Sequence, residues 1–157
     1  MQPFKKILSP IDFSDPSRSA LDVAADMAKR FDAELWLVHV VPAIPKLDAP
    51  SEFFKEREYE DRLHQEAVNH LQTLADNLAK QGIKTKTEVG TANDAAMELV
   101  RIAEHNAIDL IVIATHGMSG WHKLVFGSVT EKVVRVSHCP VLILRAEAAA
   151  ASAKTSA

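Results

Sequence analysis

The chain has 157 residues, of which 47% are hydrophobic and 25% charged, and its formal net charge is −3. This balance is typical of a single soluble globular domain, and it argues against nucleic acid as the main partner, which requires a dominant basic surface. No apolar run approaches the roughly 18 residues of a membrane helix, and no signal peptide precedes the first strand-like run. Because Cys139 is the single cysteine, a disulfide within the chain is excluded, and we expect a cytoplasmic protein.

Apolar, β-branched runs alternate with segments of helical periodicity in the first half of the chain. Residues 4–12 and 34–41 are predicted strands, and the near-continuous apolarity of the second is typical of an interior strand. Asp15, followed by a proline, is predicted to be the N-cap of the intervening helix. Residues 52–80 are rich in charge but carry a stripe of leucine and valine, which predicts a long helix with one buried face.

The second half continues the same alternation. Residues 84–89 are predicted to form a short edge strand, and Thr91 with Asp94 has capping-box spacing at the start of the next helix. The remaining predicted elements are a strand at 110–114, a helix at 128–137 and a strand at 141–144. Residues 146–157 form an alanine-rich tail with nothing bulky to bury, so we expect disorder there and a domain spanning residues 1–145.

This order of strands and helices predicts a single α/β domain with a doubly wound, five-stranded parallel sheet. Right-handed crossovers allow the strand order 3-2-1-4-5, with helices on both faces. In that order the winding reverses between the first and fourth strands, and open sheets bind ligands at such a point, outside the carboxyl ends of the strands. Asp12 and the turn at 114–117 are expected to lie there.

The segment IATHGMSGWHKLVFGSVTEKVV, residues 113–134, connects the fourth strand to the last helix. It contains three glycines, and no acidic residue occurs from Leu110 to Thr130 although the chain has 21. Glycines let backbone amides approach an anion, and a helix N-terminus adds unpaired donors, so the segment favours an anion site. An ordinary capped turn is the alternative, because Ser128 and Glu131 have capping-box spacing and neither GxxxxGK[ST] nor GxGxxG is present.

Other reactive residues form no recognisable catalytic pattern. His39 lies within an apolar strand and is interpreted as a structural side chain or part of a pocket wall rather than a metal ligand. Cys139 lies beside a buried strand and is interpreted as a packed thiol. Since no nucleophile elbow is present, a hydrolase triad is not supported, and we assign neither a catalytic residue nor a metal site.

Several separated motifs resemble the nucleotide-binding branch of the universal stress protein family. The opening KKILSPIDFSDPSRSAL, the strand LVHVV and the closing SHCPVLIL are similar to that family in order and spacing, over residues 4–145. The loop of the family reads G-x2-G-x9-G-[ST]. Gly117, Gly127 and Ser128 match its second half, whereas Ala114 replaces its first glycine.

The resemblance implies that an adenine nucleotide (ATP, or ADP or AMP), with or without Mg²⁺, lies across the switch point of the sheet. Asp12 and the backbone at Val40 would face the adenosine, while Gly117 and Gly127 would lie at the phosphates. Met118 stands where relatives often carry a basic residue, so this departure and the missing glycine lower the expected affinity. The predicted nucleotide-binding residues are Pro10, Ile11, Asp12, Val40, Ala114, Thr115, His116, Gly117, Met118, Gly120, His122, Gly127, Ser128, Val129 and Thr130.

Three functions remain open at this point. The resemblance favours an ATP-binding stress-response or regulatory protein that acts as a nucleotide-sensitive homodimer. A slow ATPase on the same site and a nucleotide-free protein-interaction dimer are the alternatives. The dimer is expected to pair along the last strand, whose apolar edge would otherwise stay open. The residues of that strand are Val141, Leu142, Ile143 and Leu144.

Overall fold

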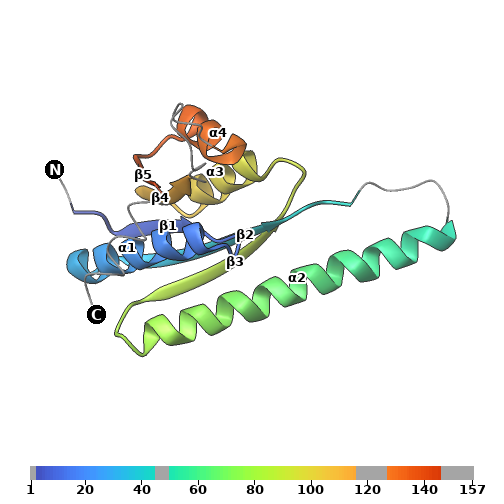
Figure 1. Cartoon of the computed structure of the whole chain (residues 1–157), viewed down its shortest axis with the longest axis horizontal. Helices are drawn as coiled ribbons and strands as arrows, with labels where there is room; N and C mark the ends of the chain where they lie inside the picture. Colours follow the sequence, from blue (N-terminus) through green and yellow to red (C-terminus); the bar gives the residue numbers. More distant parts are fainter. Residues whose placement is uncertain (1–2, 45–49, 116–126, 146–157) are drawn as a thin grey trace.

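The computed structural model describes residues 3–44, 50–115 and 127–145, and of residues 50–54 only the backbone. Its strands form one parallel five-stranded sheet in the order β3-β2-β1-β4-β5, with helices on both faces (Figure 1). The strands are β1 (Lys6–Pro10), β2 (Glu34–Val41), β3 (Thr85–Thr91), β4 (Leu110–Thr115) and β5 (Val141–Arg145). The helices are α1 (Asp15–Phe31), α2 (Pro50–Ala79), α3 (Ala95–His105) and α4 (Ser128–Val136). The predicted fold class and strand order are confirmed.

The sheet separates two hydrophobic cores, and β1 contributes to both. Ile7 is fully buried in a cluster with Leu21 of α1 and Leu71 of α2. Its neighbour Leu8 is equally buried on the other face, in a cluster that includes Val133 of α4. Successive side chains of a strand point to opposite faces, so a strand covered on both sides must be apolar at nearly every position. This explains the continuous apolar runs in the sequence.

The topology opens a crevice between the ends of β1 and β4. These two strands are neighbours, but the chain leaves β1 to form α1 on one face and enters α4 after β4 on the other. Because α1 and α4 lie on opposite faces of the sheet, a crevice is expected where the carboxyl ends of β1 and β4 meet. The crevice predicted at the switch point therefore exists, and both strand ends reach it.

The starts of two helices differ from the prediction. The N-cap of α1 is Ser14 and not Asp15: the Ser14 hydroxyl accepts a hydrogen bond from the Ser17 amide at 3.4 Å. Asp15 cannot serve, because the amide it would cap, that of Arg18, already donates to the Ser14 carbonyl at 3.1 Å.

In α3 the N-cap is Asp94 itself, whose carboxylate accepts from the Met97 amide at 3.1 Å. The predicted pairing of Thr91 with Asp94 is wrong because Thr91 is still in the sheet, in register with Val41. A cap accepts from an amide two or three residues further on, and Asp94 is in that position for the Met97 amide.

Only part of α2 packs on the sheet. Its fully or nearly buried side chains, such as Ala67, Leu71 and Leu78, lie in its second half. The first half projects past the end of the sheet (Figure 1), where Glu60 accepts a hydrogen bond from the Ile44 amide at 3.3 Å. None of the described helices is both long and apolar enough to cross a membrane. The predicted tail, residues 146–157, lies outside the described residues.

Candidate functional site

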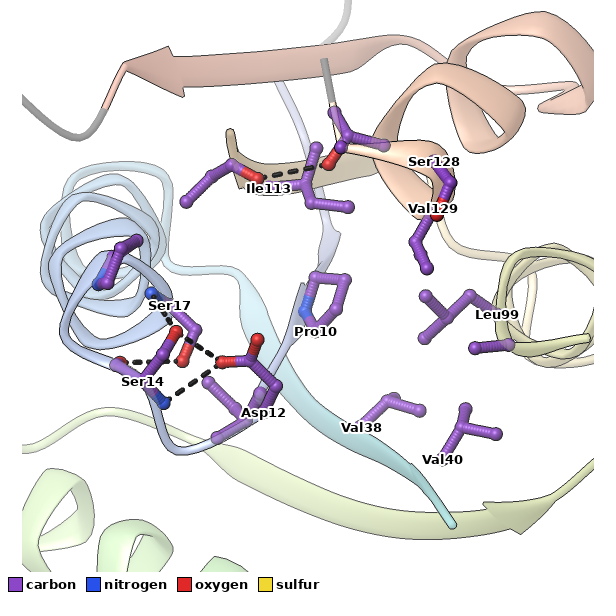
Figure 2. Close-up of a pocket in the computed structure, with 16 residues that line it drawn as sticks. Pro10, Asp12, Ser14, Ser17, Val38, Val40, Leu99, Ile113, Ser128 and Val129 are labelled. Atoms are coloured by element: carbon purple, nitrogen blue, oxygen red, sulfur yellow. Dashed lines mark hydrogen bonds between the residues drawn. The ribbon is translucent and has the colours of Figure 1, made fainter. Parts of the chain in front are cut away.

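A cavity of about 290 Å³ lies at the switch point, between the ends of β1 and β4. Figure 2 shows Asp12 and Ser14 on one side of it and Ser128 and Val129 on the opposite side. The predicted residues that line it are Pro10, Ile11, Asp12, Val40, Ala114, Gly127, Ser128, Val129 and Thr130. Residues that the sequence reasoning missed also line it: Ser14, Pro16, Ser17, Val38, Ala95, Leu99 and Ile113.

The other predicted site residues are not among the described lining. Thr115 is buried and points elsewhere, since its hydroxyl donates to the Leu144 carbonyl of β5 at 3.4 Å. The remaining ones, His116, Gly117, Met118, Gly120 and His122, lie outside the described residues.

The floor and one wall of the cavity are apolar. Val38 and Val40 come from β2, Leu99 from α3 and Ile113 from β4 (Figure 2). Val38 is fully buried and Leu99 nearly so, which means that these side chains are held by the core behind them. Apolar walls with few polar groups are typical of pockets that bind a planar organic ring.

The β1–α1 turn carries the acidic side of the cavity. One carboxylate oxygen of Asp12 accepts from both the amide and the hydroxyl of Ser14, at 3.0 and 2.5 Å. Since Ser14 also caps α1, the aspartate and the helix start are joined in one hydrogen-bonded turn (Figure 2). The Asp12 side chain is exposed at the mouth of the cavity, where it can accept a hydrogen bond from a ligand.

Side chains behind this turn hold its backbone. Nδ1 of His39 lies 2.6 Å from the Ile11 carbonyl oxygen, and the Ile11 amide donates to the Val38 carbonyl at 2.8 Å. Phe13 has a φ of 65°, in the left-handed region that non-glycine residues seldom adopt. Its ring lies between those of His39 and His70, with centroid distances of 4.9 and 5.1 Å. His39 is therefore a structural side chain, one of the two roles expected for it.

The opposite side of the cavity is the start of α4. Its N-cap is Gly127, and no side chain of the described residues caps this turn. The first amide to bond within the helix is that of Glu131, which donates to the Gly127 carbonyl at 3.0 Å. The amides from Gly127 to Thr130 precede it and have no partner inside the helix. They leave a set of donors, with the positive end of the helix dipole, beside the cavity.

The capping box expected for α4 is not formed. Ser128 is the first helical residue rather than the cap, so its hydroxyl is one position too late to satisfy the first turn. Glu131 instead pairs with Arg135 one turn further on, at 2.7 Å between Oε1 and Nη2. The capped-turn alternative therefore loses the contact on which it rested, and no side chain among the described residues caps these amides.

The electrostatics of the described lining depend on backbone groups. No lysine, arginine or histidine side chain is among the described residues of the cavity, and Asp12 is its one acidic group there. Next to the lining residue Ala95, Asp94 pairs with Lys132 of α4. The hydrogen bond from Lys132 and that from the Met97 amide hold the pKa of Asp94 below its usual value.

Neither the cysteine nor the histidines form a metal centre in the part of the chain described. No three His, Cys, Asp or Glu side chains gather there in a way that could hold an ion. Cys139 is half-buried, with its sulfur 3.5 Å from the Ser137 hydroxyl oxygen, as expected for a packed thiol.

Together the sheet order and the cavity define a doubly wound α/β domain with a cavity at its switch point. The sequence matches the family model "Universal stress protein family" over residues 3–145. Universal stress protein MJ0531 of Methanocaldococcus jannaschii is 37% identical over 142 residues, which is 90% of this chain and 82% of that protein. The solved structure of MJ0577 superposes with a TM-score of 0.76 at 31% identity, covering 91% of this chain and 96% of the other. The chain belongs to the universal stress protein family.

Two further solved structures of this fold are described as complexes with adenine nucleotides. A universal stress protein in complex with cAMP has a TM-score of 0.62 at 23% identity, over 92% of this chain and 98% of that one. The universal stress protein from Archaeoglobus fulgidus in complex with dAMP has a TM-score of 0.60 at 20% identity, over 91% and 98%. At these identities the likeness is one of fold.

Proposed function

We propose that this protein binds an adenine nucleotide, ATP or its products ADP and AMP, in the switch-point cavity and acts as a nucleotide-sensitive regulatory module. The observation that carries the proposal is that the two ends of the cavity differ chemically. Exposed Asp12 lies at one side of an apolar slot, and the uncapped first turn of α4 lies at the other. A nucleotide has groups that match these features: a flat ring for the apolar slot, a base amine or ribose hydroxyls that can donate to Asp12, and a phosphate for the start of α4.

In this arrangement the adenine ring packs between the aliphatic side chains of Val38, Val40 and Leu99. Asp12 accepts a hydrogen bond from a ribose hydroxyl or from the base amine, and the backbone at Val40 faces the base. The Asp12 carboxylate suits the adenosine end of the ligand, because at the other end it would repel the phosphates. The phosphates lie at the amides of Ser128 and Val129, where a helix N-terminus favours negative charge.

The relatives support the class of ligand. Two proteins of the same fold are described as complexes with cAMP and dAMP, both of which contain adenine and a phosphate. Gly117, which lies outside the described residues, is proposed as a second phosphate contact together with His116, Met118, Gly120 and His122. Mg²⁺ would be held by phosphate oxygens and water, because the one acidic group of the described lining is at the adenosine end.

Binding, rather than hydrolysis, is the proposed activity. Hydrolysis needs a group that orients or deprotonates water next to the last phosphate. Asp12 is the one ionisable side chain of the described lining, and it is already engaged by Ser14 on the far side of the cavity. Single-turnover measurements with Mg²⁺ are therefore expected to show ATP loss at the rate of buffer alone. A turnover well above that rate would favour a slow ATPase.

A homodimer formed along β5 completes the proposal. β5 is the last strand of the sheet, and Val141, Leu142, Ile143 and Leu144 are each only half-buried. An open apolar strand edge invites pairing, and a second copy of β5 would continue the sheet. Sedimentation equilibrium at micromolar concentrations is expected to give twice the chain mass, and a monomer at all concentrations would exclude this dimer.

Equilibrium titration with ATP, ADP and AMP tests nucleotide binding directly. Gly127→Val places a branched side chain at the phosphate end of the cavity and is expected to abolish binding without unfolding the protein. Val134→Ala, on the same helix but 46% exposed and away from the lining, is the matched control and should bind as the wild type does. If the wild type binds none of the three nucleotides below millimolar concentration, the nucleotide-free interaction dimer is the better function.

A further inference from the structure

Thr130 lines the cavity, but its hydroxyl does not point to a ligand. It donates a hydrogen bond to the Ala114 carbonyl oxygen at 3.0 Å. The residue is 5% exposed, so this bond is shielded from water. A hydroxyl has one proton to donate, and in Thr130 that proton is already committed to the protein.

This bond joins the two ends of the connection that carries the glycine-rich motif. Ala114 is near the end of β4, and Thr130 is in the first turn of α4. The start of α4 is therefore tied directly to the end of β4. A buried bond to a strand carbonyl fixes how far the α4 amides lie from the sheet.

The other described side-chain contacts of α4 fix the position of its first turn less well. Lys132 pairs with Asp94 of α3, but both side chains are nearly half-exposed, and exposed ion pairs hold geometry weakly. Val133 is fully buried in the core, but its apolar contact is not directional and restricts the rotation of the helix less sharply than a hydrogen bond does. The hydrogen bond of Thr130 is directional, and it is one residue away from the Val129 amide.

We infer that Thr130 is a positioning residue for the phosphate site. It orients the first turn of α4 so that the amides of Ser128 and Val129 converge on one phosphate, and it does not itself donate to the ligand. The inference rests on the proposed function and assigns the residue a different role from the direct contact expected from the sequence. It also predicts that the effect of Thr130 is confined to the phosphate end of the ligand.

Three variants and two ligands test this. Thr130→Val keeps the shape of the side chain and removes the hydroxyl, whereas Thr130→Ser keeps the hydroxyl. Affinities are measured for ATP and for adenosine, which has the same base and sugar but no phosphate. Val134→Ala is the control for a change on α4 outside the cavity. Thermal melting of every variant establishes that it is folded before titration.

We expect Thr130→Val to weaken ATP binding about tenfold, the size of one hydrogen bond, and to leave adenosine binding within about twofold of the wild type. Thr130→Ser should bind ATP nearly as the wild type does. Equal ATP affinity in Thr130→Val and the wild type would overturn the inference, as would an equal loss for ATP and adenosine, which indicates a general structural role. Failure of the wild type to bind ATP would instead remove the proposed function. If Thr130→Val is unfolded, a tenfold ATP loss in folded Thr130→Ser would also overturn the inference.

Discussion

Replacing Gly127 by aspartate should weaken ATP binding while leaving the fold at least as stable. Gly127 is the N-cap of α4, with φ −56° and ψ 148°, a conformation open to residues with a side chain. Aspartate is among the preferred N-cap residues, and its carboxylate would accept hydrogen bonds from the same amides that are proposed to bind phosphate. The aspartate carboxylate would therefore compete with the phosphate of ATP for these amides.

The effect on the stability of the fold and the effect on ATP affinity have opposite signs and can be estimated separately. A carboxylate at a helix N-terminus contributes about 0.3–1 kcal/mol, so the free energy of unfolding should be unchanged or slightly higher. Two like charges about 4 Å apart repel by about 1 kcal/mol in water and about 4 kcal/mol near a protein surface. Ser128 and Val129 are exposed, so the lower part of that range applies. The expected loss of ATP affinity is about tenfold to a hundredfold.

Isothermal titration with ATP and adenosine, together with urea unfolding, measures both quantities. Gly127→Asn is the matched control: it caps the helix with a side chain of the same shape but without charge, so it should weaken ATP binding less than the aspartate. Adenosine should bind equally to all three proteins. Unchanged ATP affinity in Gly127→Asp would show that the first turn of α4 does not meet the phosphates.

Two further predictions concern residues that lie beside the cavity without lining it. The pKa of Asp94 is lowered by Lys132 and the Met97 amide, so its contribution to stability is present at neutral pH and is lost as the pH falls below about 4. Urea unfolding across pH should show Asp94→Asn less stable than the wild type at pH 7 and equal to it in acid; a constant difference would contradict this. Behind the β1–α1 turn, His39→Leu leaves the Ile11 carbonyl without its partner and should lower the free energy of unfolding by about 1–3 kcal/mol. His39→Asn, whose amide can still donate, should lose less in the same unfolding assay, and an equal loss would mean that packing on Phe13 dominates.

Some site residues could be found from the sequence because their signals are local. Asp12 follows a strand, and Gly127 with Ser128 precedes a helix, so the rule that ligands bind at the carboxyl ends of strands was sufficient to bring them together. Ala95 and Leu99 have no such signal. They line the cavity because α3 packs across the same face of the sheet as α4, and that contact joins parts of the chain with no common motif.

The order of elements and the bounds of β2 could be predicted from the sequence, because a strand covered on both faces is apolar at nearly every position. The N-caps were harder to predict because several nearby side-chain oxygens can accept from the first amides of each helix. Ser14 and Asp94 are the caps because of where the preceding strands end. That the Thr130 hydroxyl donates to the Ala114 carbonyl follows from the packing of α4 beside β4 and could not be predicted from the sequence. A hydroxyl has several possible partners, and the one it takes depends on which carbonyl the folded chain places within its reach.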